Sequence, residues 1–198
     1  MEPRNTPALE TERLILRRFC TDDIPALFAI YSDREVNTYL PWFPLASLAE
    51  AERLFENEYA KAYELPWGYR YAVCLKTDSV PIGYVHLSTE EAHDLGYGLS
   101  KRFWHRGIAA EAARAVVERA KADGLPYITA THDVNNPRSG SVMRALGMRY
   151  QYTYREQWQP KDISVTFRLY QLNLDGNEGR VYRRYWEQYA DHWVEGTG

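Results

Sequence analysis

The stretch WHRGIAAEA, from Trp104 to Ala112, joins a glycine turn directly to the start of an alanine-rich helix. The first backbone N–H groups of a helix lack partners within it, and the aligned peptide dipoles place a partial positive charge at the same end. Both effects favour a bound phosphate. Gly107 lets the backbone come close to a ligand, and Ala109 and Ala110 add little bulk there. The stretch therefore predicts an anion-binding helix start.

A plainer interpretation of this junction stays open, because a glycine before a helix occurs in many proteins for turn geometry alone. A dinucleotide fingerprint is not indicated. The GxGxxG pattern needs two further glycines at set spacing, and this turn has Gly107 only. The rest of the chain has to decide between a phosphate site and a simple turn.

Length and composition indicate one globular domain. The chain has 198 residues, of which 45% are hydrophobic and 26% are charged. A net charge of −3 and the lack of a lysine or arginine block argue against nucleic acid as a partner. The two cysteines, Cys20 and Cys74, do not resemble a disulfide framework, and a cytoplasmic location fits them best. No apolar run is long enough to span a bilayer, and the first residues lack the apolar core of a signal peptide, so neither membrane nor export is expected.

Hydrophobic periodicity predicts an alternation of strands and helices. Apolar runs and period-2 alternation between turn residues predict strands, over 13–19, 69–75, 80–87, 94–100, 127–133, 150–158 and 163–172. Apolar residues at helical spacing predict helices, over 24–31, 48–62, 109–123 and 139–146. Ser47 and Glu50 form a capping-box pattern at the second helix. The order is strand, two helices, three strands, helix, strand, helix and two strands.

This order, together with WHRGIAAEA and the later segment NNPRSGSVMRALGM, resembles the GNAT superfamily of acetyl-CoA-dependent N-acetyltransferases. The resemblance covers about residues 9 to 173. The branch that it most resembles is the Rim branch, whose founding members acetylate N-termini of ribosomal proteins. The segments that carry this likeness are LETERLILRRF, VPIGYVHL, LGYGLSKRFWHRGIA and LYQLNL. One position departs from the family pattern, since Met148 stands where Phe is common.

The resemblance implies an α/β (α+β) fold. Its centre would be a mixed, mostly antiparallel, seven-stranded GNAT-type sheet with helices on both faces, followed by a C-terminal helix. The chain would divide into an acetyltransferase domain at 1–173 and an aromatic helical extension at 174–198. The resemblance also implies acetyl-CoA as the co-substrate and no metal.

By the same resemblance, backbone N–H groups from Arg106 to Ala110 would bind the coenzyme pyrophosphate, and the Arg106 side chain would add charge. A backbone N–H near Leu99 or Ser100 would polarise the thioester carbonyl, a kind of donor worth about 3 kcal/mol. Without the resemblance, Arg106 is equally well a solvated surface arginine. The residues expected to bind the coenzyme are Leu99, Ser100, Trp104, Arg106, Gly107, Ile108, Ala109, Ala110, Asn136 and Ser139.

Asn136 and Ser139 have two interpretations. The resemblance gives Asn136 the pantetheine arm and places the Ser139 hydroxyl near the sulfur, where it would stabilise or protonate the leaving thiolate. Asn and Ser are also common cap and turn residues, and NNPRS ahead of a helix is typical of a cap. Many relatives use a tyrosine in this helix as the acid, and residues 138–147 contain none.

The general base has to take a proton from an alkylammonium whose solution pKa is near 10, so its own pKa must be raised or it must act through water. Candidates cluster between the third and fourth strands, at Glu90, Glu91, His93 and Asp94. His93 has the most suitable unperturbed pKa, and an exposed Asp94 would be too acidic without burial. For any single one of these side chains, a solvated loop charge is the more common interpretation.

Two further segments bear on the site. His132 and Asp133, at the end of the fifth strand, are a second possibility for the base, although such a histidine is more often a core residue. Aromatic side chains are expected to bind the acceptor, because loops on a rigid scaffold often carry binding groups. The candidates are Tyr39, Trp42, Phe43 and Trp67. Aromatic residues at a bend also often belong to the core.

Beyond residue 173, aromatic residues recur at helical spacing and predict a helix over 181–193. The stripe consists of Val181, Tyr182, Tyr185, Trp186, Tyr189 and Trp193. Such a helix would dock on its own domain, form a homodimer contact or cover the acceptor cleft, because an exposed aromatic patch is costly in water. A membrane-surface helix is the weakest alternative, since acidic residues offset its arginines.

The expected function is transfer of an acetyl group from acetyl-CoA to a primary amine, by direct attack in a ternary complex. The amine would belong to a protein N-terminus or to a small molecule, and a net negative charge is mildly compatible with a cationic acceptor. The alternative is a non-catalytic acyl-CoA-binding or interaction protein on the same fold. Neither nucleic acid nor a membrane is an expected partner.

Overall fold

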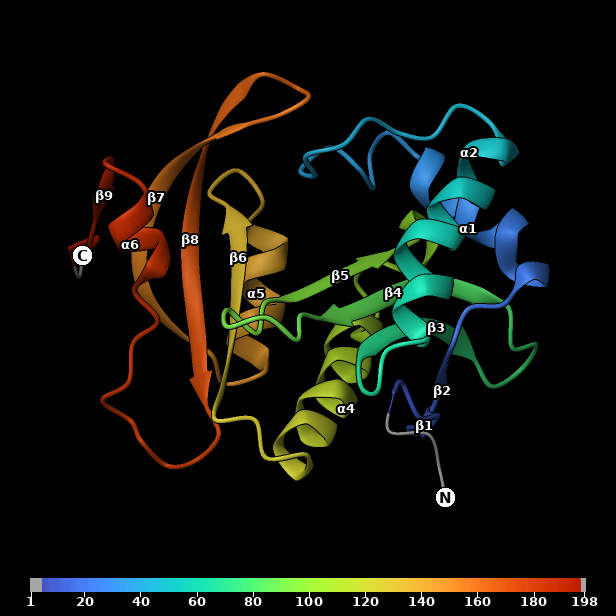
Figure 1. The fold of residues 1–198 in the computed structure, drawn as a ribbon, viewed down its shortest axis with the longest axis horizontal. Helices are drawn as coiled ribbons and strands as arrows, with labels where there is room; N and C mark the ends of the chain where they lie inside the picture. Colours follow the sequence, from blue (N-terminus) through green and yellow to red (C-terminus); the bar gives the residue numbers. More distant parts are fainter. Residues whose placement is uncertain (1–4, 197–198) are drawn as a thin grey trace.

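Two antiparallel sheets lie side by side and diverge from each other between their neighbouring strands β5 and β6 (Figure 1). The structure is a computed structural model that describes residues 5–196. The first sheet has the strand order β1 (Leu9–Glu10), β2 (Leu14–Arg17), β3 (Tyr69–Leu75), β4 (Pro81–Leu87) and β5 (Leu95–Leu99). The second has the order β6 (Tyr127–Asp133), β8 (Ile163–Asn173), β7 (Arg149–Trp158) and β9 (His192–Trp193).

All seven predicted strands are present as β2 to β8, but the prediction of one continuous seven-stranded sheet is wrong. Between β5 and β6, one isolated parallel bridge joins Asp94 to Thr129 within the described residues. There the Thr129 N–H donates to the His93 carbonyl at 3.1 Å. Beyond this point the two strands separate. The separation matters for function because it leaves one edge of β5 without a neighbouring strand.

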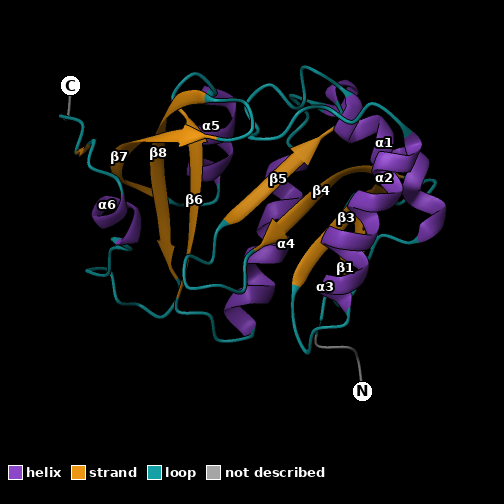
Figure 2. Cartoon of the chain, turned by 45° about the horizontal axis from the view of Figure 1, so that its top comes forward, coloured by secondary structure: helices purple, strands orange, loops and turns teal. Residues whose placement is uncertain are grey.

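Helices cover the first sheet on both faces (Figure 2). One face carries α1 (Ile24–Ser32), α2 (Leu48–Leu54), the π-helical turn η2 (Phe55–Ala60) and α3 (Lys61–Tyr63). The other face carries α4 (Ile108–Ala122). The predicted cap of α2 is confirmed, since the Ser47 side chain accepts a hydrogen bond from the Glu50 N–H.

Strand β3 explains why two separate cores form. Tyr71 and Val73 belong to the core beneath α4, whereas Ala72 and Cys74 belong to the core beneath α1 and η2. Successive side chains of a strand point to opposite faces, so a strand that is apolar at every position is buried on both sides. The near-continuous run of apolar residues in YRYAVCL therefore requires helices on both faces of this sheet.

The predicted C-terminal helix over 181–193 is wrong in length. The structure has a short helix, α6 (Arg184–Gln188), after which the chain turns extended at Tyr189 and forms β9. Strand β9 pairs with β7, and the Arg155 N–H donates to the Asp191 carbonyl at 2.9 Å. The aromatic side chains of the segment pack on strands β7 and β8 of their own chain. A homodimer through this segment stays a prediction.

Candidate active site

The start of α4 has the geometry that the sequence predicts for a phosphate site. Gly107 precedes the helix with a φ of 73° and a ψ of 0°, in the left-handed region that favours glycine. No side chain caps this end of the helix. Its first N–H groups, at Ile108, Ala109 and Ala110, are therefore placed to bind an anion. The Ile108 side chain is buried in the core, so only its backbone faces the ligand side.

Arg13, from the start of the chain, holds this turn in place. Its guanidinium donates to the Arg106 carbonyl at 3.0 Å and forms an ion pair with Glu111 at 2.6 Å. Burial opposes the charge of Glu111, but hydrogen bonds from Thr11 and Arg13 hold the pKa of its carboxyl below the usual value. The Arg106 side chain itself is exposed. Arg13 therefore neutralises Glu111, an acidic residue in the first turn of a helix whose start is expected to bind phosphate.

The end of β5 supplies one backbone donor on the open side of the sheet. The Ser100 N–H donates to the Ile82 carbonyl of the neighbouring chain segment at 2.8 Å, so it is already used. Leu99 pairs with Gly83 in the next register position. Donors along an antiparallel strand point alternately to its two sides, so the Leu99 N–H points away from β4 and toward the gap between β5 and β6. Of the two predicted thioester donors, the geometry favours Leu99.

Trp104 also contacts the end of β5. Its indole N–H donates to the Leu99 carbonyl at 2.7 Å, and the Arg138 guanidinium lies 5.2 Å from the centre of its ring. Trp104 thus ties the end of β5 to the turn before α4 and to the helix α5 (Pro137–Ala145). These contacts give Trp104 a structural role beside the predicted coenzyme site.

A cavity of about 350 Å³ lies where the two sheets diverge. It is bounded by the loop between α1 and α2, by β4 and β5, by the β6–α5 junction and by the strands β7 and β8. The sequence-predicted residues that line it are Tyr39, Trp42, Asp94, His132, Asp133, Asn136 and Ser139. The cavity brings together residues from both halves of the chain, and we refer to it as the cleft.

Asp94 is the predicted base candidate whose position fits that role best. Its Oδ1 atom is buried and has no hydrogen-bond partner, and the side chain lines the cleft. Burial raises the pKa of its carboxyl from 3.8 to about 7. The Asp94 carbonyl accepts from the Ser88 N–H at 2.9 Å, which fixes the backbone. A carboxylate with this pKa is suited to accept a proton near neutral pH.

The other predicted candidates between β4 and β5 do not line the cleft. Glu90 and Glu91 are exposed, and Glu91 forms an ion pair with Arg184 at 3.6 Å. The His93 ring packs 5.2 Å from the ring of Tyr127. Glu90 and Glu91 therefore fit the interpretation as solvated charges, and His93 fits a packing role. Of the four candidates, Asp94 alone lines the cleft.

His132 lies in the cleft as a buried, neutral ring. Burial lowers the pKa of its imidazole, and its Nδ1 atom is 2.8 Å from the Asp133 carbonyl. A Cβ added at Gly140 would lie 2.6 Å from the His132 Nε2 atom, so glycine allows α5 to pack directly on this ring. His132 is therefore better suited to support α5 than to act as a base. Asp133 also contributes to the lining.

Asn136 and Ser139 take the cap geometry that the plainer interpretation predicts. The Asn136 side chain accepts from the Ser139 N–H at 3.4 Å and caps α5. Both side chains also line the cleft, so the cap and a coenzyme role are compatible. A residue that the sequence reasoning missed meets them here. The Tyr97 hydroxyl, from β5, donates to the Ser139 carbonyl at 2.7 Å and lies 3.0 Å from Ser139 Oγ.

A chain of buried polar groups backs the cleft on the side of the first sheet. His86 Nε2 lies 3.0 Å from the Tyr59 hydroxyl, which lies 3.0 Å from the Tyr31 hydroxyl. Burial lowers the pKa of His86 to about 3, so this ring is neutral at physiological pH. Sequence reasoning missed His86, although its alternation with the buried residues of VPIGYVHL places its side chain on one defined face.

Two of the four residues predicted to bind the acceptor line the cleft, and the acceptor role itself stays a prediction. Tyr39 and Trp42 line the cleft, and the Trp42 indole N–H donates to Asn37 Oδ1 at 3.2 Å. Phe43 is 59% exposed and lies outside the lining. Trp67 packs edge-on against Tyr69 at 6.0 Å and also lies outside it, because it belongs to the turn before β3. The opposite wall consists of residues that were not predicted, Trp158 and Phe167.

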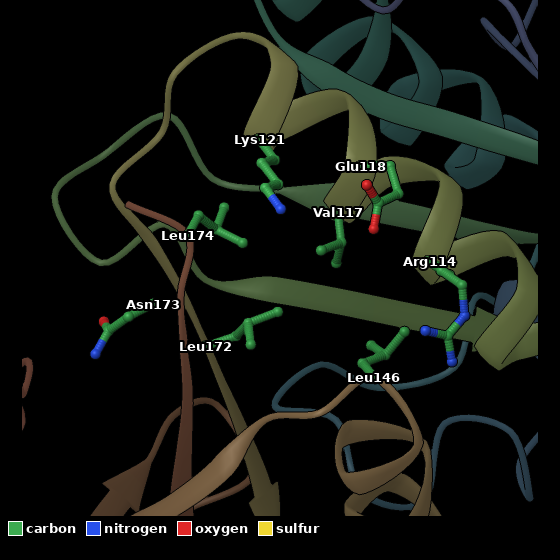
Figure 3. Close-up of a pocket in the computed structure, with 8 residues that line it drawn as sticks. All are labelled: Arg114, Val117, Glu118, Lys121, Leu146, Leu172, Asn173 and Leu174. Atoms are coloured by element: carbon green, nitrogen blue, oxygen red, sulfur yellow. The ribbon is translucent and has the colours of Figure 1, made fainter. Parts of the chain in front are cut away.

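A second, smaller cavity of about 230 Å³ lies along α4, beyond its first turn (Figure 3). Its lining comes from α4, from the residue after α5 and from the end of β8. The charged side chains drawn there are Arg114, Glu118 and Lys121. None of the predicted site residues contributes to this cavity. The cleft between the sheets is therefore the better candidate for the active site.

Neither a metal site nor a membrane-spanning helix is found over residues 5–196. Within this range, no group of three or more His, Cys, Asp and Glu side chains has the arrangement needed to hold a metal ion. In the same range, no helix combines the length and the apolar character needed to cross a membrane.

Comparisons with known proteins agree with the fold. Residues 13–149 match the acetyltransferase (GNAT) domain family. The chain is 28% identical over 169 residues to the uncharacterized N-acetyltransferase YoaA of Bacillus subtilis (strain 168), covering 80% of this chain and 94% of YoaA. The family match includes β5, the turn before α4 and α5.

Two solved structures share the fold at low sequence identity. One is RimL, a ribosomal L7/L12 alpha-N-protein acetyltransferase in complex with coenzyme A, with a TM-score of 0.75 and 16% identity over 86% of this chain and 99% of RimL. The other is the microcin C7 self immunity acetyltransferase MccE in complex with acetyl-CoA and AMP, with a TM-score of 0.72 and 13% identity over 82% of this chain and 93% of MccE. The family match spans most of the chain, so the chain belongs to the GNAT acetyltransferase family.

Proposed function

We propose that this protein is an acetyl-CoA-dependent N-acetyltransferase that acetylates a primary amine by direct attack in a ternary complex. The observation that carries the proposal is the position of Asp94. Its Oδ1 atom is buried without a hydrogen-bond partner, and the residue lines the same cleft as Ser139, just before the start of the strand that ends at Leu99. A base and a hydroxyl in one cleft, with a backbone donor at the other end of the bordering strand, are groups that acyl transfer to an amine requires.

Each group has a distinct role in this proposal. The N–H groups at the start of α4 bind the pyrophosphate of acetyl-CoA, with Arg106 at the rim. The Leu99 N–H polarises the thioester carbonyl. Asp94 lies about 16 Å along the strand from Leu99, so it accepts the proton of the attacking amine through intervening water as the C–N bond forms. The Ser139 hydroxyl donates a hydrogen bond to the thiolate as the C–S bond breaks. The walls around Tyr39 and Trp42 hold the acceptor.

The Rim-like sequence motifs support acetylation of a protein N-terminus, and the aromatic lining of the cleft is compatible with a small-molecule amine as well. The low identity of RimL and MccE restricts those likenesses to the fold, so their acceptors do not decide between the two. A cytoplasmic location, as the cysteine content favours, would supply acetyl-CoA to either reaction.

The proposal is tested by thiol release from acetyl-CoA in the presence of a panel of amines and N-terminal peptides. Asp94→Asn should lower turnover by about 100-fold or more, the usual contribution of a general base, and leave acetyl-CoA affinity within about twofold. Glu91→Gln is the matched control, because it neutralises a nearby carboxylate that lies outside the cleft. It should leave turnover unchanged.

Two results would contradict the proposal. Coenzyme binding without acetylation of any amine would favour a non-catalytic acyl-CoA-binding protein on the same fold. Equal turnover by Asp94→Asn and Glu91→Gln would remove Asp94 from the mechanism and leave the base to be found elsewhere.

A further inference from the structure

The charges that line the cleft restrict the chemistry of the acceptor beyond the requirement for an amine. Two carboxyl side chains, Asp94 and Asp133, contribute to the lining. Among the residues from 5 to 196, no lysine or arginine lines the cleft. Burial lowers the pKa of both lining histidines, His86 and His132, so they add no positive charge at neutral pH.

Cationic groups near the cleft are engaged elsewhere or lie on the coenzyme side. Lys161, in the β7–β8 turn, donates to the carbonyls of Asn37 at 3.2 Å and Thr38 at 3.4 Å. Lys161 therefore ties the β7–β8 hairpin to the loop between α1 and α2. Figure 1 shows the tip of this hairpin approaching that loop. The positive end of α5 meets the cleft at Asn136 and Ser139, where the proposed function places the coenzyme.

The remaining walls on the acceptor side are apolar and largely aromatic. Leu40, Pro41 and Trp42 line one side, and Trp158 and Phe167 line the other. The rings of Trp158 and Phe167 lie 5.0 Å apart. Aromatic faces beside a carboxylate attract an ammonium group and cover an apolar body, and they offer nothing to pair with an anion.

We infer that the acceptor is an amine with an apolar or aromatic body and no anionic group beside the amino group. This inference rests on the proposed function and specifies its substrate class. A free amino acid would bring its α-carboxylate next to Asp94 and Asp133, with no cation in the lining to compensate. Like charges placed together in a partly buried site are strongly unfavourable, so the cleft selects against such acceptors.

Three indole amines test this selection, because they share one ring and one amine and differ only beside it. Tryptamine carries hydrogen at that carbon, tryptophanamide a neutral carboxamide, and tryptophan a carboxylate. Initial rates are compared at equal concentrations of unprotonated amine. We expect tryptamine and tryptophanamide to be acetylated, and kcat/KM for tryptophan to be at least about tenfold lower than for tryptophanamide. Equal values for tryptophan and tryptophanamide would overturn the inference.

A matched pair of variants assigns the effect to Asp133. Asp133 Oδ1 accepts from the Asn135 N–H at 2.8 Å, and asparagine keeps that acceptor, so Asp133→Asn removes the charge alone. Asp78 makes the same local contact with the Val80 N–H at 3.0 Å, in the β3–β4 turn. Asp133→Asn should raise the tryptophan to tryptophanamide ratio severalfold, and Asp78→Asn should not. An unchanged ratio in Asp133→Asn would contradict the role given to this carboxylate.

Calorimetric binding of the three amines to the coenzyme-loaded protein separates this inference from the proposed function. If tryptophanamide binds more tightly than tryptophan and neither is acetylated, the acceptor chemistry holds and the catalytic proposal fails. If kcat/KM for tryptophan equals that for tryptophanamide, the catalytic proposal holds and the acceptor chemistry fails.

Discussion

The Tyr97 hydroxyl lies 3.0 Å from Ser139 Oγ and donates to the Ser139 carbonyl at 2.7 Å, although the two residues are 42 positions apart in the chain. Tyr97 belongs to β5 and Ser139 to the first turn of α5. Strand β5 thus supplies a phenol to a helix that has no tyrosine between 138 and 147. Burial raises the pKa of Tyr97, so the phenol keeps its proton and remains a hydrogen-bond donor at neutral pH.

Ser139→Ala is expected to lower turnover and leave acetyl-CoA affinity nearly unchanged, because its hydroxyl would act on the thiolate that forms in the transition state. The loss should be about tenfold to 100-fold, the size of one hydrogen bond to a charged group. Tyr97→Phe should give a smaller loss of kcat, since the phenol orients the serine. Steady-state kinetics and coenzyme titration measure both effects.

Ser141→Ala is the control for these two variants. Ser141 lies in the same helix, is exposed, and donates to the Pro137 carbonyl at 3.0 Å. It should keep full turnover. If Ser139→Ala behaved like Ser141→Ala, the serine would be only part of the cap of α5.

Gly107→Glu is expected to abolish coenzyme binding. The new carboxylate would stand at the helix start that binds the pyrophosphate, and the φ of 73° would strain any residue with a Cβ. Gly124→Glu is the control, because Gly124 follows the other end of α4, has a φ of 85° and has no atom within 4 Å of an added Cβ. Both variants carry similar strain, so a comparable loss of affinity in both would argue against a phosphate site at Gly107. Isothermal titration with acetyl-CoA measures the difference.

Arg13→Met is expected to weaken acetyl-CoA binding by about threefold to tenfold, because it exposes the Glu111 charge beside the pyrophosphate and frees the Arg106 carbonyl. Adding Glu111→Gln should restore most of the affinity. Arg119→Met is the control, since Arg119 pairs with Asp123 at 2.8 Å at the opposite end of the same helix. If the double variant bound acetyl-CoA as weakly as Arg13→Met, Arg13 would act through its hydrogen bond to the Arg106 carbonyl and not through the charge of Glu111.

The strands could be predicted from the sequence because their signal is local. Residues 69–75 read as a strand from their own composition, and the structure has β3 there. The division into two sheets could not be predicted, since it depends on how residues near Asp94 and Thr129 pair across 35 positions of chain. Local patterns carry no information on such pairing.

The C-terminal segment shows how tertiary packing overrides a local pattern. Aromatic residues four apart fit a helix, but the Tyr189 ring stacks on Tyr154 at 5.0 Å, and the chain there has already left the helix to pair with β7. The starts of α4 and α5 were predictable for the opposite reason. The turn at Gly107 and the cap at Asn136 are encoded by a few adjacent residues, whereas Tyr97, His86 and Phe167 reach the cleft from distant strands.

The raised pKa of Asp94 predicts the pH dependence of both activity and stability. As a base, its carboxyl must be ionised, so kcat/KM should fall about tenfold per pH unit below the pKa of about 7. The folded state also binds this proton more tightly than the unfolded chain, whose pKa is near 3.8. Asp94 therefore stabilises the fold fully below the unfolded value, and that contribution is lost as the pH rises through about 7.

Asp94→Asn separates these two effects, because it cannot ionise and keeps nearly the same shape. The residual kcat/KM of this variant should not show the fall below about pH 7 that the wild type shows. Its free energy of unfolding, measured with urea between pH 4 and pH 8, should fall less over this range than that of the wild type. At pH 8 the variant should be the more stable protein, since a desolvated carboxylate has been replaced by a neutral amide. A wild-type stability profile as flat as that of the variant would show that water solvates Asp94 in the cleft and that its pKa lies near the ordinary value.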